Sequence, residues 1–110
     1  MTVFGILFDY APNFNANPEF SAFWSDIFHK REGISGISIS NLIKQCSVYQ
    51  RYDGSLTTPP CSETVAWHVC ISNVGVNQLP LLDYTYALNG IQNYRPIQAL
   101  NNRTVTTLTA

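Results

Sequence analysis

Continuous or alternating apolar stretches predict four strands in this chain. Residues 2–10 form a run rich in Val, Ile, Leu and Phe, which is typical of a strand buried on both faces. Residues 47–55 and 62–72 alternate between apolar and polar positions, and residues 104–108 form a short β-branched stretch. Because four strands leave the most apolar ones without neighbours on both sides, we expect another chain segment to complete the sheet.

The strand predicted over residues 62–72 has two distinct faces. Successive side chains of a strand point to opposite sides. One face therefore carries Val65, Trp67 and Val69, and the other carries Thr64, Ala66 and His68.

Apolar residues at steps of three and four predict a helix that begins near Pro18. The expected apolar positions are Phe20, Phe23, Trp24, Ile27 and Phe28. Asn17 is the expected N-cap, and Gly33 and Gly36 are expected to end the helix. Residues 34–45 fit a loop with one helical turn over 41–44, and residues 78–88 fit a second short helix. The predicted class is mainly β with some helix (α+β), in one domain over residues 1–110.

Composition changes this picture in one respect, the shortage of charge. Charged residues make up 12% of the 110 residues, about half of the roughly 25% usual for a soluble domain, while hydrophobic residues make up 45%. We therefore expect part of the surface to be covered by something else. The net charge of −1 provides no steering toward nucleic acid.

The chain has no predicted membrane span and no predicted signal peptide. Its longest apolar runs, such as residues 3–8, fall far short of the roughly 20 residues that a membrane helix needs. The N-terminus lacks a basic region, and Asp9 interrupts the first apolar run. The three cysteines, Cys46, Cys61 and Cys70, match no zinc or CxxC spacing, so either one thiol seeks a partner elsewhere or all three are reduced.

Three motifs in order carry a family resemblance. Residues 52–63, Tyr-Asp-Gly-Ser-Leu-Thr-Thr-Pro-Pro-Cys-Ser-Glu, followed by Val65 and Trp67, resemble the active-site loop and next strand of the α-carbonic anhydrases. Residues 3–6 resemble that family's strand after its third zinc histidine, and residues 93–103 resemble its C-terminal signature. The chain is therefore similar to the C-terminal part of an α-carbonic anhydrase domain, and the N-terminal half of that domain is missing. The fold that this resemblance implies is a large mixed sheet with one or two short helices.

The resemblance implies roles for six residues. The family hydrates CO2 to bicarbonate by attack of a zinc-bound hydroxide, since zinc lowers the pKa of its bound water to about 7. Thr57 is expected to orient that hydroxide, because a threonine hydroxyl both accepts and donates. The substrate-binding residues implied by the resemblance are Val3, Leu56, Thr58, Val65 and Trp67. Ordinary core packing is the alternative for the apolar ones, and both roles are compatible.

The zinc ligands implied by the resemblance have no match in this sequence. The family uses three histidines upstream of the strand that resembles residues 3–6, and this chain has two histidines, His29 and His68, on different predicted elements. His68 is predicted to point away from Trp67, and Glu63 resembles a structural position. We therefore expect this chain alone to bind no zinc and to lack hydratase activity, with the missing N-terminal half of the domain as its partner.

The resemblance also implies an exported parent protein. In exported members, a cysteine at the position of Cys61 pairs with one near the N-terminus of the domain, which has no match here. Asn102-Arg103-Thr104 is a glycosylation sequon that overlaps the C-terminal signature, so its asparagine alternatively serves the fold. A carbonic-anhydrase-related binding or adhesion module is the competing function, although Thr57 and Thr58 favour the enzyme. An unrelated small β domain is disfavoured by the ordered motifs.

Overall fold

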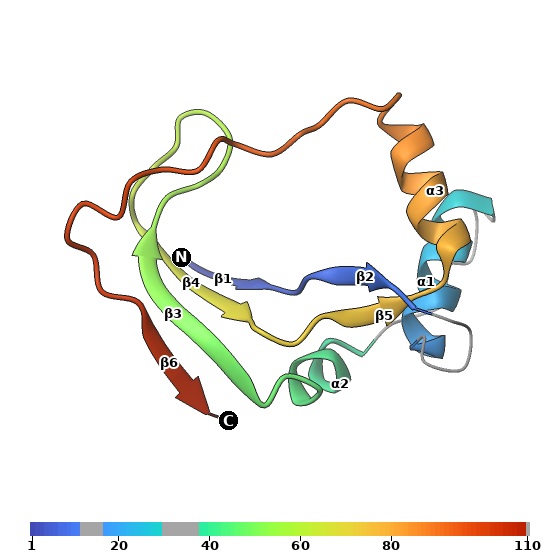
Figure 1. The fold of residues 1–110 in the computed structure, drawn as a ribbon, viewed down its shortest axis with the longest axis horizontal. Helices are drawn as coiled ribbons and strands as arrows, with labels where there is room; N and C mark the ends of the chain where they lie inside the picture. Colours follow the sequence, from blue (N-terminus) through green and yellow to red (C-terminus); the bar gives the residue numbers. More distant parts are fainter. Residues whose placement is uncertain (12–16, 30–37, 110) are drawn as a thin grey trace. The chain divides into compact units, whose positions relative to one another are not determined.

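The computed structural model describes residues 1–11, 17–29 and 38–109, and they fall into two compact units. The first unit comprises Met1–Leu7, Lys44–Ser72 and Asn93–Ala110, and the second comprises Phe8–Ile43 and Asn73–Gln92. Figure 1 shows their elements along the chain. In the described part of the chain, no helix has the length and apolar character needed to cross a membrane.

The first unit is built on a four-stranded mixed sheet (Figure 1). Its strands, in spatial order, are β1 (Thr2–Gly5), β4 (Val65–Cys70), β3 (Val48–Gly54) and β6 (Thr106–Thr109). β1 runs parallel to β4, whereas β3 is antiparallel to both β4 and β6. The strands predicted over residues 47–55, 62–72 and 104–108 are confirmed, and the mixed sheet with short helices agrees with the predicted fold class.

The single buried strand predicted over residues 2–10 is wrong. The structure divides this stretch into β1 and a separate strand, β2 (Phe8–Tyr10), which pairs in parallel with β5 (Val74–Val76) in the second unit. Leu7 and Tyr10 are more than half exposed. Among the described strands, β1 pairs with β4 alone and therefore lies at the edge of the sheet. Its apolar composition would instead suit a central strand. The prediction missed β5 because three residues with a central glycine give too short a pattern.

The second unit contains the predicted helix and its N-cap. α1 (Pro18–His29) begins where the Phe20 backbone N–H donates to Asn17 Oδ1 at 3.1 Å. The Phe20 side chain is buried and packs edge-on against Phe8, with ring centroids 4.6 Å apart. The side chains of Trp24, Ile27 and Phe28 and the predicted end at Gly33 and Gly36 lie outside what the structure describes.

Two shorter helices complete the second unit. α2 (Ile39–Lys44) extends the single turn predicted over residues 41–44, and the Asn41 N–H donates to Ser38 Oγ at 3.2 Å. α3 (Gln78–Ala87) confirms the helix predicted over residues 78–88 and contacts α1. It ends at Ala87 with Leu88 as its C-cap, and the next two residues, Asn89 and Gly90, have positive φ angles of 51° and 70°.

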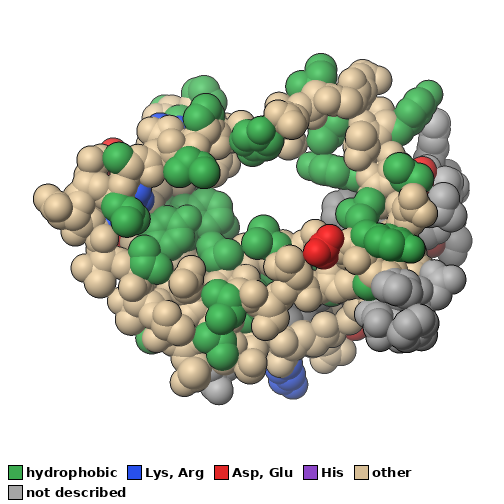
Figure 2. All heavy atoms as spheres, viewed as in Figure 1, with side chains coloured by type: hydrophobic (Ala, Val, Ile, Leu, Met, Phe, Trp, Pro, Cys, Tyr) green, Lys and Arg blue, Asp and Glu red, His purple; other side chains and the backbone are tan. Residues whose placement is uncertain are grey.

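Much apolar surface of both units remains exposed. Figure 2 shows hydrophobic side chains spread over the face in view, with isolated charged side chains among the described atoms. In the first unit, the exposed fractions are 73% for Met1, 69% for Tyr94 and 101% for Ile97. Apolar surface of this extent is typical of a protein surface that another segment or partner covers, as the low charge content predicts.

A disulfide joins Cys46 to Cys70, with the two Cα atoms 5.8 Å apart. It connects the segment before β3 to the last residue of β4, while Cys61 remains a free cysteine. The sequence left this pairing open, because three cysteines allow several arrangements. The bond is formed between neighbouring elements of the first unit.

Candidate functional site

The loop between β3 and β4 carries the two threonines of the main motif. β3 and β4 are in antiparallel register up to the pair Gly54 and Val65, so residues 55–64 connect two adjacent strand ends. The Leu56 N–H donates to the Ser62 carbonyl at 3.0 Å, and the Cys61 N–H donates to the Thr58 carbonyl at 2.9 Å. These two bonds close the loop and leave Thr57 and Thr58 exposed.

Ser55 ties this loop to two distant parts of the first unit. Trp67 Nε1 donates to the Ser55 carbonyl at 2.9 Å, and Arg95 Nη1 donates to Ser55 Oγ at 2.8 Å. The Ser55 hydroxyl in turn donates to the Leu56 carbonyl at 3.0 Å. Because Ser55 lies two residues before Thr57, these contacts fix the entry of the chain into the threonine-bearing segment.

Trp67 lies in a stack of planar groups on one face of the sheet. Its ring is nearly parallel to that of Tyr52, with centroids 6.4 Å apart and an interplanar angle of 9°. The Arg103 guanidinium carbon lies 5.9 Å from the Tyr52 centroid. A Cβ atom at Gly54 would lie 2.8 Å from Trp67 Cδ1, so the approach of this indole to the backbone requires glycine.

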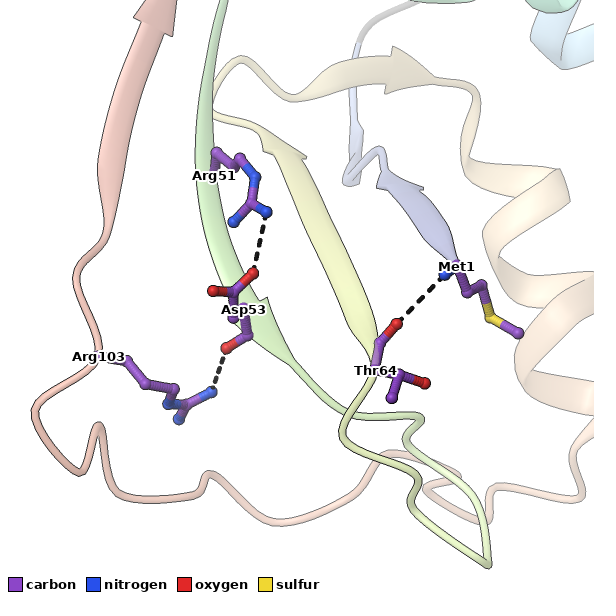
Figure 3. A network of polar contacts seen from close by, with 5 residues as sticks. All are labelled: Met1, Arg51, Asp53, Thr64 and Arg103. Carbon is purple, nitrogen blue, oxygen red and sulfur yellow. Dashed lines mark hydrogen bonds and ion pairs between the residues drawn. The ribbon is translucent and has the colours of Figure 1, made fainter.

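Arg103 fastens the C-terminal segment to β3. Its Nη1 donates to the Asp53 carbonyl at 2.9 Å, as Figure 3 shows. Its Nε and Nη2 donate to the carbonyls of Leu100 and Ala99, both at 2.8 Å. The Asp53 carboxylate forms an ion pair with Arg51 at 2.9 Å (Figure 3). A rigid guanidinium suits this role, because its fork of donors satisfies three carbonyls at once.

A cavity of about 380 Å³ lies against the Trp67 face within the first unit. Thr57, Tyr52 and Trp67 line one side of it, and Arg95 and Ile97 of the C-terminal segment line another. A neighbouring cavity of about 440 Å³ has charged residues in its lining, including Asp53, Glu63 and Arg95. The structure therefore brings together two of the predicted site residues, Thr57 and Trp67.

The other four predicted residues lie outside the lining of this cavity. Val3 is the register partner of Trp67 on β1, so it lies beside Trp67 on the same face of the sheet. Val65 is 2% exposed and belongs to the core. Leu56 is half-buried, whereas Thr58 is exposed at the loop tip.

His68 lies on the opposite face of the sheet from Trp67, as the alternation predicts. Its ring stacks on Phe4, with centroids 5.3 Å apart and an interplanar angle of 12°. Tyr49 lies 5.7 Å from the same ring. His68 Nδ1 is buried and has no hydrogen-bond partner in the described part of the chain. This histidine is held by aromatic contacts and points away from the cavity.

A catalytic zinc ion does not fit the described residues. Across residues 1–11, 17–29 and 38–109, no three His, Cys, Asp or Glu side chains gather closely enough to hold a metal ion. The cavity lining contains neither a histidine nor a cysteine, and protein zinc sites are built mainly from these residues.

Several residues that shape this site had no individual role predicted from the sequence. Arg95, Arg103 and Gly54 belonged to the motifs that carried the resemblance, without individual functions. For the two arginines, the one signal in the sequence is their position in an irregular segment of a chain that contains few charged residues.

Known proteins resemble this chain in both sequence and fold. A model of the eukaryotic-type carbonic anhydrases matches residues 1–109. The chain therefore belongs to the eukaryotic-type carbonic anhydrase family.

Individual relatives agree with this assignment. A carbonic anhydrase of Pectobacterium carotovorum is 31% identical over 109 residues, which cover 96% of this chain and 43% of the relative. The α-carbonic anhydrase of Thermovibrio ammonificans, solved with sulfanilamide, is 33% identical with a TM-score of 0.75, over 94% of this chain and 46% of that structure. Dioscorin, solved with ascorbate, is 28% identical with a TM-score of 0.72, over 98% and 47%. The chain thus spans less than half the length of these proteins.

Proposed function

We propose that this chain supplies the part of an α-carbonic anhydrase active site that positions substrate and nucleophile, in a protein that reversibly hydrates CO2 to bicarbonate. The observation that carries the proposal is the Trp67 Nε1 bond to the Ser55 carbonyl. It links the apolar wall expected for CO2 to the loop that bears Thr57. Arg95 holds the same serine from its other side through the hydroxyl.

Thr57 is the residue that we assign to orientation of the nucleophile. Its side chain is exposed and lies on the wall of the cavity that Trp67 also lines. A threonine hydroxyl offers one donor and accepts at its lone pairs, so it can fix the direction of a neighbouring hydroxide or water. Trp67 and Val3, side by side on their sheet face, offer the apolar contact that suits CO2.

Zinc in this family supplies the hydroxide, and we place its ligands in a part of the domain outside this chain. The described residues offer no fitting set of ligands. The missing N-terminal half of the domain is therefore the partner that we propose for the exposed apolar surface of the first unit. This chain by itself is then inactive.

Stopped-flow measurement of CO2 hydration tests this proposal. The chain with added zinc is expected to show no turnover above buffer. A fusion of the chain behind the zinc-binding half of the Pectobacterium carotovorum enzyme is expected to bind zinc and to hydrate CO2. Turnover by the chain alone would contradict the proposed division of the site, as would an inactive fusion that is folded and loaded with zinc.

Thr57 variants of that fusion test the residue assignment. We expect Thr57→Ala to lower kcat/KM on the order of 100-fold, the usual loss when one oriented hydrogen-bonding group is removed from a reacting centre. Thr57→Ser keeps the hydroxyl and is expected to retain most activity, and zinc content should be equal in all three proteins. Equal kcat/KM for the alanine and serine variants would remove Thr57 from the mechanism.

A non-catalytic binding module is the second candidate function. Dioscorin is similar in fold and was solved in complex with ascorbate, so one structural neighbour holds a small molecule, as a binding module would. The two candidates differ in the segment that precedes the match to residues 3–6. Three histidines in the family pattern in the coding sequence upstream would favour the enzyme, and substitutions there would favour the binding module.

We also propose that the parent protein is extracellular or in the secretory pathway. The Cys46–Cys70 disulfide supports this, because such bonds form and persist in oxidising compartments. Cys61, the free cysteine, is expected to pair with a cysteine of the missing half. Non-reducing peptide mapping of the protein from its natural source would test both bonds.

A further inference from the structure

The sequon Asn102-Arg103-Thr104 lies in a surface turn that leads into β6. Asn101 and Asn102 have φ angles of 50° and 65°, and the Arg103 N–H donates to the Leu100 carbonyl at 3.0 Å. Asparagine adopts this left-handed conformation more readily than other residues with a side chain. The backbone of the turn therefore explains why asparagine suits this position, without any role for its amide.

The side chains of the sequon separate into one inward anchor and two outward groups. Arg103 is turned inward, since its guanidinium donates to the carbonyls of Asp53, Ala99 and Leu100. Asn102 and Thr104 are both exposed. The Asn102 amide makes no hydrogen bond, ion pair or ring contact with any residue that the structure describes. A bulky group on its nitrogen would break none of the contacts that hold the turn.

The disulfide provides an independent link to the compartment where such modification takes place. Cys46 and Cys70 are bonded in the same unit as the sequon, although neither contributes to the turn. Disulfides of this kind form in the secretory pathway of eukaryotes, where asparagine residues of sequons receive their glycans. The disulfide and the sequon are therefore both compatible with a chain that enters this pathway.

We propose that Asn102 is an acceptor site for an N-linked oligosaccharide. The donor class is an oligosaccharide carried on a lipid diphosphate. Asn102 Nδ2 forms a bond to C1 of the first sugar, while the bond between C1 and the diphosphate oxygen breaks. The lipid diphosphate leaves with the electron pair, and the amide nitrogen loses one proton. Thr104 is the hydroxyl residue that the sequon requires at its third position.

Expression in a eukaryotic secretory system tests this site. For this experiment, a cleavable secretion signal is added before the full chain, and a tag with its own Asn-Gly-Thr sequon is added after it. Glycans are counted on molecules whose tag is glycosylated, in both the cells and the medium. We expect the unchanged chain to lose two glycans stepwise on partial digestion with peptide-N-glycosidase. The Asn102 peptide should then contain aspartate.

Matched variants separate the site from the fold. Thr104→Ser keeps the hydroxyl and is expected to retain both glycans. Thr104→Ala is expected to retain the tag glycan alone, and so is Asn102→Asp, which tolerates the left-handed backbone. A glycan on the tag but none on the unchanged Asn102 would overturn the proposal, and so would two glycans on the Thr104→Ala variant.

Discussion

The two faces of the four-stranded sheet both carry clustered rings but differ in how those rings are held. On the cavity face, Trp67 and Tyr52 stack, and Trp67 is bonded to the Ser55 carbonyl. On the opposite face, His68 lies among Phe4 and Tyr49 with Nδ1 buried and unpartnered in the described part of the chain. Polar bonds to distant segments therefore distinguish the cavity face, whereas contact alone holds the other cluster.

This difference shows which side chains the site depends on. A ring held by contact can be exchanged for another ring of similar size, because stacking and burial have little directionality. A ring or guanidinium held by hydrogen bonds to fixed carbonyls is specific in both chemistry and geometry. We therefore expect substitutions on the cavity face to lower the free energy of unfolding by more than the change in side-chain size alone would.

The largest effect is expected for Trp67. Trp67→Ala should lower the free energy of unfolding by about 3 kcal/mol, because it removes a large ring from the stack and leaves a void. Trp67→Phe keeps a ring but loses the bond to Ser55, with an expected cost of about 1 kcal/mol. Urea unfolding followed by far-UV circular dichroism measures both values. Equal costs for the two variants would show that the hydrogen bond, and not the ring, is what matters.

A smaller effect is expected for Arg103, which can be compared with Arg51 on the opposite face. Arg103→Lys should cost about 2 kcal/mol in the same unfolding experiment, since one ammonium cannot satisfy three carbonyls in fixed directions. Arg51 pairs with an Asp53 side chain that is 78% exposed. Arg51→Lys should therefore cost less than about 1 kcal/mol, as exposed ion pairs do. A larger cost at Arg51 would reverse the contrast between the faces.

The face assignment was predictable from the sequence, because it depends on the two-residue period of a strand alone. Val65, Trp67 and Val69 alternate with Ala66 and His68, and the register of β4 with its neighbours agrees with that alternation. The helix that begins at Pro18 was predictable for a similar reason, since its N-cap and its spacing are both local signals.

The contacts that position the loop were not predictable, because they join residues far apart in the sequence. Arg95 reaches Ser55 across 40 positions, and Arg103 reaches Asp53 across 50. No local pattern encodes such pairs. The strand predicted over residues 2–10 failed for a related reason, since apolar composition indicates burial but not which partner provides it. Its two halves pair with β4 and with β5.

The smallest effect is expected at His68, where the contrast between the faces is tested most directly. His68→Phe should change the free energy of unfolding by less than about 1 kcal/mol, because it keeps the stack on Phe4 and removes a buried nitrogen that lacks a partner. His68→Ala should cost more, since the ring contacts with Phe4 and Tyr49 are lost. If the phenylalanine variant were instead destabilised by more than about 2 kcal/mol, Nδ1 would have to be hydrogen-bonded in solution. Hydrogen bonds would then hold the rings on both faces of the sheet. The two faces would no longer differ in whether a ring can be replaced by another ring of similar size.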